Sequence, residues 1–116
     1  EDNVSVVLSY RNGSTAVINY TAYGNRRVPK EQVEIFSSDV FMRMDDFREL
    51  TIYRGTGRRE ILRSRDQDKG FKAEFDTLTT AIKTGESPVS FDSIYSTTRA
   101  TFKILESLRT GQPATI

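Results

Sequence analysis

The stretch "SYRNGSTAV" (Ser9–Val17) decides how the N-terminal part of the chain folds. Asn12-Gly13 lies in it between two runs in which apolar and polar residues alternate. That dipeptide between such runs predicts a β-hairpin closed by a two-residue type I′ turn. The register that this turn implies pairs Arg11 with Ser14, Leu8 with Val17 and Val7 with Ile18.

In this predicted hairpin, apolar side chains occur on both faces of the ribbon. One face carries Val4, Val6, Leu8 and Tyr10, and the other carries Val7, Ile18, Tyr20 and Ala22. Because exposed apolar patches usually mark contacts, we expect the second face to meet another subunit or domain, with Val7, Ile18 and Tyr20 as interface residues. The alternative is that these three are ordinary half-exposed strand residues.

The middle of the chain continues in short strands. Alternation and turn residues predict strands over 32–36, 40–44, 50–54 and 60–63. Asp45-Asp46 is interpreted as a turn that ends a strand, because adjacent strand residues point to opposite faces and cannot act as an acid/base pair. Gly55-Thr56-Gly57 is also a turn, since no helix follows it as a phosphate-binding motif requires.

The last third of the chain changes to helical spacing. Phe71, Phe75, Leu78 and Ile82 mark one helical face, with Asp68 as the expected N-cap and Gly85 as the residue after the helix. A second helix is expected over 93–110. Asp92 is its expected N-cap, Gly111 and Pro113 end it, and its stripe comprises Ile94, Thr98, Thr101, Leu105 and Leu108.

Strands followed by helices predict an α+β fold. We expect a mostly antiparallel sheet of five or six strands, with both C-terminal helices packed on one face and the other face open. The 116 residues correspond to a single domain, 1–116. Because the chain opens on Glu1 and reaches a strand pattern by Val4, we interpret it as an excised piece of a longer protein.

Composition narrows the function classes. The 17 basic and 16 acidic residues are interspersed and give a net charge of +1, which favours neither nucleic acid nor an anionic membrane as a partner. Lys69–Phe75 partly matches an RNA-binding octamer, but its phenylalanines belong to the helical stripe. The absence of cysteine fits the cytoplasm. Without histidine or cysteine, Ser-His-Asp and Cys-His catalysis are impossible within these residues, and no catalytic, metal or cofactor-binding set is predicted.

One group of residues remains as a candidate binding site. Asn25, Arg26, Arg27 and Lys30 lie on the loop between two predicted strands, where binding residues are often found. Their cationic and amide groups are suited to a phosphate, a carboxylate or sugar hydroxyls. The alternative is a solvated basic loop without a ligand.

Five stretches taken in order resemble the C-terminal part of the glucose–fructose oxidoreductase / inositol dehydrogenase (Gfo/Idh/MocA) family. They are "DNVSVVLSYRNGSTAVINYTAYG" (Asp2–Gly24), "VPKEQVEIF" (Val28–Phe36), "MDDFRELTIYRG" (Met44–Gly55), "KGFKAEFDTLTTAIKTGESPVSFD" (Lys69–Asp92) and "TTRATFKILESLRTGQP" (Thr97–Pro113). The chain is particularly similar to members fused to, or found with, zinc-type alcohol dehydrogenase domains.

The resemblance implies a function for the whole protein. Family members have an N-terminal Rossmann domain that binds NAD or NADP, and an α+β domain that contacts substrate and forms oligomers through an open sheet face. Their substrates are sugars, polyols and other small hydroxylated compounds. The family's dinucleotide and Lys-Pro motifs belong to the Rossmann domain, so no catalytic residue transfers onto this chain and the fragment itself is expected to be inert. The second hypothesis is a non-enzymatic module that binds a protein partner through its open sheet.

Overall fold

The structure, a computed structural model, describes residues 2–116. It contains six strands and two helices, and the fold is α+β as predicted. The elements are β1 (Asn3–Ser9), β2 (Thr15–Thr21), β3 (Gln32–Ser37), β4 (Val40–Asp45), β5 (Glu49–Arg54), β6 (Glu60–Arg63), α1 (Phe71–Thr84) and α2 (Phe91–Thr110). Within the described residues, neither helix combines the length and the apolar character needed to cross a membrane.

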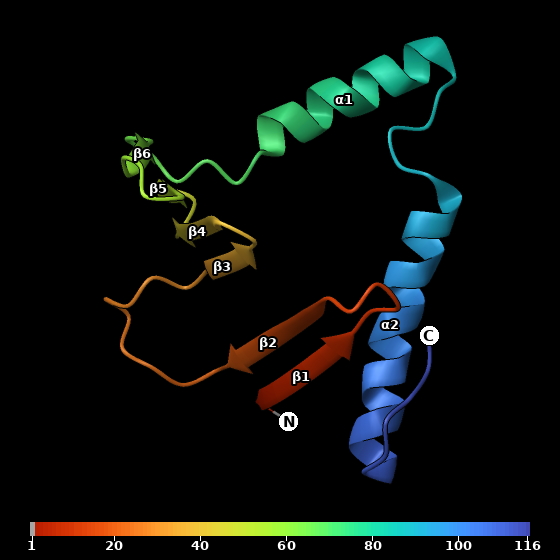
Figure 1. Ribbon diagram of the computed structural model, residues 1–116. Helices are drawn as coiled ribbons and strands as arrows, with labels where there is room; N and C mark the ends of the chain where they lie inside the picture. The colour runs from red at the N-terminus through yellow and green to blue at the C-terminus, as the bar shows by residue number, and fades with distance from the viewer. Residues whose placement is uncertain (1) are drawn as a thin grey trace. The chain divides into compact units, whose positions relative to one another are not determined.

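The strands form two antiparallel sheets, which corrects the expectation of one sheet with five or six strands. β1 and β2 pair as a hairpin, and β3, β4, β5 and β6 pair in sequence order in a second sheet (Figure 1). The chain divides into two compact units: residues 2–23 with 75–116 form one, and Gly24–Glu74 form the other. The loop that begins at Gly24 interrupts strand pairing between β2 and β3.

The hairpin has a different register from the predicted one. Leu8 pairs with Ala16 and Val6 with Ile18, one residue away from the expected partners. The loop is three residues long, because Tyr10 N donates to the Ser14 carbonyl at 2.9 Å and Gly13 N donates to the Tyr10 carbonyl at 3.0 Å. Gly13 has φ +83°, the left-handed conformation that a three-residue hairpin loop requires at this position.

This register changes which side chains share a face. A shift of one residue moves every side chain of a strand to the opposite face. Val7 therefore lies opposite Val17, among serines, threonines and asparagines, and not on the face of Ile18 and Tyr20. The prediction that Val7, Ile18 and Tyr20 form one face is wrong. Most of the hairpin's apolar residues gather on the other face: Val4, Val6, Leu8, Ala16, Ile18 and Tyr20.

Helix α2 lies beside this hairpin (Figure 1), and a hollow of about 410 Å³ separates it from β1. Val6 and Leu8 are half-buried there, as are Ala100, Ile104 and Ser107 of the helix. The expected stripe through Ile94, Thr98, Thr101, Leu105 and Leu108 remains largely exposed. The small residues Ala100 and Ser107 lie along the helix side that lines this hollow, which apolar spacing alone does not predict.

The helix ends are partly as expected. Gly85 and Gly111 follow the helices with φ +75° and +66°, and each donates its N–H to a carbonyl of the last turn, as C′ glycines do. The N-cap of α2 is Ser90, whose hydroxyl accepts from Ser93 N at 3.2 Å. The prediction of Asp92 as N-cap is wrong by two residues; Asp92 lies in the first turn, where a negative charge favours the helix dipole.

Directly paired residues share a face, and their pattern gives the four-stranded sheet one apolar face and one face of mixed character. The apolar face comprises Val33, Ile35, Met42, Met44, Leu50, Ile52 and Leu62. The other face carries charged residues and an aromatic row in which Phe41 lies 4.8 Å from Phe36 and 5.8 Å from Tyr53, between ring centroids. Ile52, at 7% exposure, is the one buried hydrophobic residue among residues 2–116.

Candidate functional site

A hollow of about 590 Å³ lies at one end of the four-stranded sheet. Three segments of the unit Gly24–Glu74 line it: the loop before β3, the turn between β4 and β5, and the segment after β6. Its lining residues are Arg26, Arg27, Val28, Pro29, Lys30, Asp45, Asp46, Arg48, Glu49, Gln67 and Lys69. A volume of this order fits a small molecule.

The loop before β3 is held in shape by Asn25. Its side-chain Oδ1 accepts from Arg27 N at 2.9 Å, and its carbonyl accepts from Val28 N at 3.0 Å. The first bond forms an Asx turn and the second closes a β-turn, and asparagine is favoured at the first position of both. Asn25 is absent from the lining, so its observed role is to shape the loop that carries Arg26 and Arg27.

The turn between β4 and β5 is unusual because it contains no glycine. Asp46 and Phe47 have φ +52° and +55°, as the central residues of a type I′ turn do, and Arg48 N donates to the Asp45 carbonyl at 3.0 Å. Left-handed backbone at such residues costs about 1 kcal/mol each. Asp46 N donates to the Glu31 carbonyl at 2.7 Å, which ties the turn to the start of β3.

The segment after β6 closes over this turn. Gln67 Nε2 donates to Asp46 Oδ1 at 2.8 Å, and Lys69 Nζ pairs with Glu31 Oε1 at 2.7 Å. The Lys69 ammonium also lies 5.8 Å from the centroid of the Phe47 ring. These contacts join residues 21 and 38 positions apart in the sequence and hold the three segments at the same end of the sheet.

The carboxylates that line the hollow are all paired with arginines. Asp45 accepts from Arg43 Nε at 3.1 Å, Asp46 Oδ2 lies 3.6 Å from Arg48 Nε, and Glu49 accepts from Arg63 Nε at 2.8 Å. The lining cations Arg48 and Lys69 are therefore paired as well. By contrast, Arg26, Arg27 and Lys30 make no ion pair with any described residue, and all three are exposed. The hollow thus has an excess of positive charge on its loop side.

Glu49 illustrates how these pairs affect titration. The hydrogen bond from Arg63 lowers the pKa of the Glu49 carboxyl below its ordinary value of 4.5, while desolvation opposes the shift. Because the pKa is lower in the folded state, the ionised carboxylate stabilises the fold above the unfolded pKa. That stabilisation is lost as pH falls through the folded pKa.

We expect Arg63→Gln to return the pKa of Glu49 toward 4.5, because the first cause of its lowering is removed. NMR titration of the side-chain carboxyl carbons measures this directly. Arg65→Gln, which removes the same charge two residues away, is the matched control and is expected to leave Glu49 unchanged. Equal effects of the two substitutions would contradict the assignment.

The predicted site residues are largely brought together by the structure. Arg26, Arg27 and Lys30 line one hollow, and Asn25 supports them. Sequence reasoning missed Arg48, Gln67 and Lys69, which come from the turn and the segment after β6. The predicted strand order could have identified Arg48. In an antiparallel sheet, the start of β3 and the turn between β4 and β5 lie at the same end.

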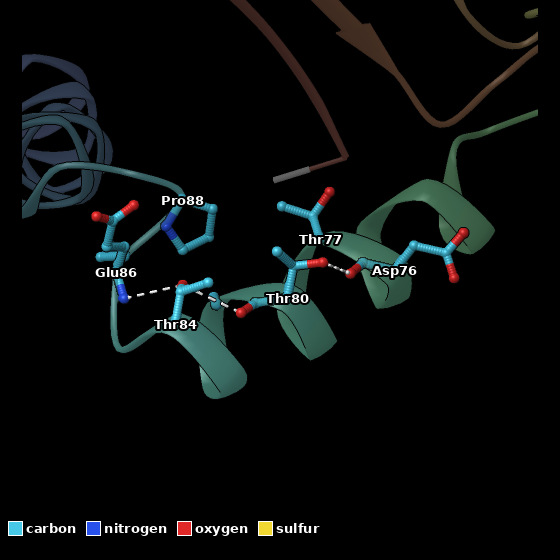
Figure 2. A pocket seen from close by; sticks show the side chains of 8 residues that line it. Asp76, Thr77, Thr80, Thr84, Glu86 and Pro88 are labelled. Atoms are coloured by element: carbon cyan, nitrogen blue, oxygen red, sulfur yellow. Dashed lines mark hydrogen bonds between the residues drawn. The ribbon is translucent and has the colours of Figure 1, made fainter.

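A second hollow, of about 390 Å³, lies along α1 and the loop that follows it, and Figure 2 shows its lining. Two of its threonine hydroxyls are occupied by the helix backbone: Thr80 donates to the Asp76 carbonyl at 2.9 Å and Thr84 to the Thr80 carbonyl at 3.1 Å. No cation lines it. The hollow beside Arg26 and Arg27 is therefore the better candidate for a ligand site.

Comparison of the chain with models of protein families, with curated proteins and with solved structures gave no match.

Proposed function

We propose that this chain is the substrate-binding and oligomerisation domain of an NAD(P)-dependent oxidoreductase of the Gfo/Idh/MocA type, acting on a sugar, a polyol or a similar small hydroxylated compound. The proposal combines the resemblance of the five stretches with one structural observation. That observation is the hollow at the end of the four-stranded sheet, which gathers polar and charged side chains from three segments. A binding site of this kind suits a domain that positions a substrate for chemistry done elsewhere.

The nucleotide cofactor belongs to another part of the proposed enzyme. In this chain the nearest approach to a dinucleotide motif is Gly55-Thr56-Gly57, and it forms the loop between β5 and β6. Gly57 N donates to the Arg54 carbonyl at 3.0 Å, and β6 follows in place of a helix. These residues do not fit a pyrophosphate, which needs the N-terminus of a following helix. We therefore assign NAD or NADP to a Rossmann domain outside these residues, in a cytoplasmic protein.

The proposal is tested by measuring NAD(P)H turnover. The 116-residue chain is expected to oxidise or reduce none of a panel of sugars and polyols, because the proposal assigns the cofactor site to another domain. The chain joined to a Rossmann domain, as the proposal requires of the whole protein, is expected to show turnover with at least one of them. Turnover by the chain alone, or an upstream sequence without a nucleotide-binding βαβ unit, would contradict the proposal.

A second function, a protein-interaction module without enzymatic activity, is favoured by a different observation. The apolar face of the four-stranded sheet includes Val33, Ile35 and Leu62, each 45% to 51% exposed. Exposed apolar faces of this kind usually bind another protein surface. An upstream coding sequence without a βαβ unit, together with binding of a different protein to this face, would favour the module over the enzyme.

A further inference from the structure

We infer that the hollow at the end of the four-stranded sheet binds an anionic group, a carboxylate or a phosphate, carried by a hydroxylated ligand. That the ligand carries hydroxyl groups rests on the proposed function. That it carries an anionic group rests on the charges of the residues that line the hollow. The groups that bind the anion are the guanidinium groups of Arg26 and Arg27 and the ammonium group of Lys30.

The first step of the argument is the state of the lining carboxylates. Each of Asp45, Asp46 and Glu49 lies 2.8 to 3.6 Å from an arginine nitrogen. They are therefore already compensated and are not the counter-ions of the loop cations. Lys69, the remaining lining lysine, is compensated by Glu31 at 2.7 Å.

The second step is the state of the loop cations. Arg26, Arg27 and Lys30 line the same hollow and pair with no acidic side chain among residues 2–116. Three cations held close together repel one another, and an anion placed among them relieves that repulsion. Guanidinium groups bind carboxylate and phosphate oxygens through paired hydrogen bonds, so Arg26 and Arg27 favour these two anions.

The third step is that the loop is held in shape before any ligand binds. The Asx turn at Asn25 fixes the backbone of Arg27, and Pro29 restricts the backbone next to Lys30. Across the hollow, the oxygens of Asp45 and Asp46 keep lone pairs beyond those used by Arg43, Arg48 and Gln67. These oxygens can accept hydrogen bonds from ligand hydroxyls, while the loop binds the anionic end.

The test is an NMR titration of the chain with four probes: glucose, glucuronate, glucose 6-phosphate and inorganic phosphate. We expect at least one of glucuronate and glucose 6-phosphate to bind about tenfold more tightly than glucose. Shifts should concentrate in 26–30, 45–49 and 67–69. Tighter binding of glucuronate would identify the preferred anion as a carboxylate, and tighter binding of glucose 6-phosphate would identify it as a phosphate. Equal affinity for glucose and both anionic sugars would overturn the inference.

Two matched double variants make the test specific. Arg26→Gln with Arg27→Gln should lower the affinity for the anionic sugar about tenfold. Arg99→Gln with Arg109→Gln removes the same two charges from α2, outside the lining, and should change this affinity less than about twofold. Equal losses would overturn the inference. Lys30→Gln repeats the test at the same hollow if the first double variant does not fold.

The outcome separates this inference from the proposed function. If inorganic phosphate binds as tightly as glucose 6-phosphate, the anion site is supported and the hydroxylated substrate is contradicted. If anionic sugars bind but the protein extended upstream shows no NAD(P)H turnover, the site stands and the enzyme assignment fails. If turnover is found with neutral sugars and no anion binds, the enzyme assignment stands and this inference fails.

Discussion

Replacing Ile52 by alanine is expected to lower the free energy of unfolding of the four-stranded sheet by about 2 to 4 kcal/mol. Ile52 is in the second of the central strands, paired with Met42 and Glu60, and is only 7% exposed. Removing three buried carbons at this position loses their transfer free energy and leaves a gap that the paired strands cannot close. Much of the apolar face around it is still partly open, and no other hydrophobic side chain among residues 2–116 is buried as completely.

The control for this substitution is Ile35→Ala, which removes the same atoms from the same face. Ile35 is 47% exposed, so its loss should cost about 1 kcal/mol or less. Urea unfolding followed through the ring signals of Tyr53 measures both, because Tyr53 is the one tyrosine between residues 24 and 74. Equal costs for the two alanines would show that Ile52 is not the centre of this sheet's packing.

If the proposed oligomer forms through the hairpin, placing a lysine at Ile18 is expected to give monomers in its place. Ile18 and Tyr20 are 48% and 60% exposed and lie on the apolar face of the hairpin, where we expect contact with a second copy. A buried lysine in such a contact loses its hydration without a counter-ion, which disfavours association by several kcal/mol. Light scattering across a range of protein concentrations measures the change.

Val17→Lys is the matched control, because Val17 is the neighbouring residue on the opposite face and is 63% exposed. It adds the same charge to the same strand and should leave the oligomer unchanged. Disruption by Val17→Lys with no effect of Ile18→Lys would place the contact on the face of Val7. A wild-type chain that is monomeric at high concentration would contradict self-association of this chain altogether.

Much of the local structure follows from sequence, because alternation and turn residues act over a few positions. The strands at 32–36, 40–44, 50–54 and 60–63 and the helix ends at Gly85 and Gly111 agree with the structure within one residue. The hairpin register does not, since Asn12-Gly13 is compatible with loops of two or three residues. Tyr10 N bonding to the Ser14 carbonyl selects the longer loop, and that choice is not visible in residue propensities.

The candidate site shows the same division. The basic loop is apparent from Arg26-Arg27 alone, because it is a local feature of composition. Whether the loop cations have ion-pair partners is a property of the fold. They have none because Asp46 pairs with Arg48 and Glu49 pairs with Arg63. Those pairs are set by strand register and by a turn with left-handed backbone at Asp46 and Phe47, which glycine-based turn rules do not anticipate.

The three-residue loop of the first hairpin also limits how this chain can vary in length. Loop tips usually tolerate insertions and deletions better than any other part of a protein. Here the separation of apolar from polar side chains depends on β2 keeping its pairing with β1, in which Ser9 lies opposite Thr15. A residue gained or lost in the loop preserves this separation if the loop absorbs the change, whereas a shift of the pairing by one residue would move the apolar side chains of β2 to the polar face.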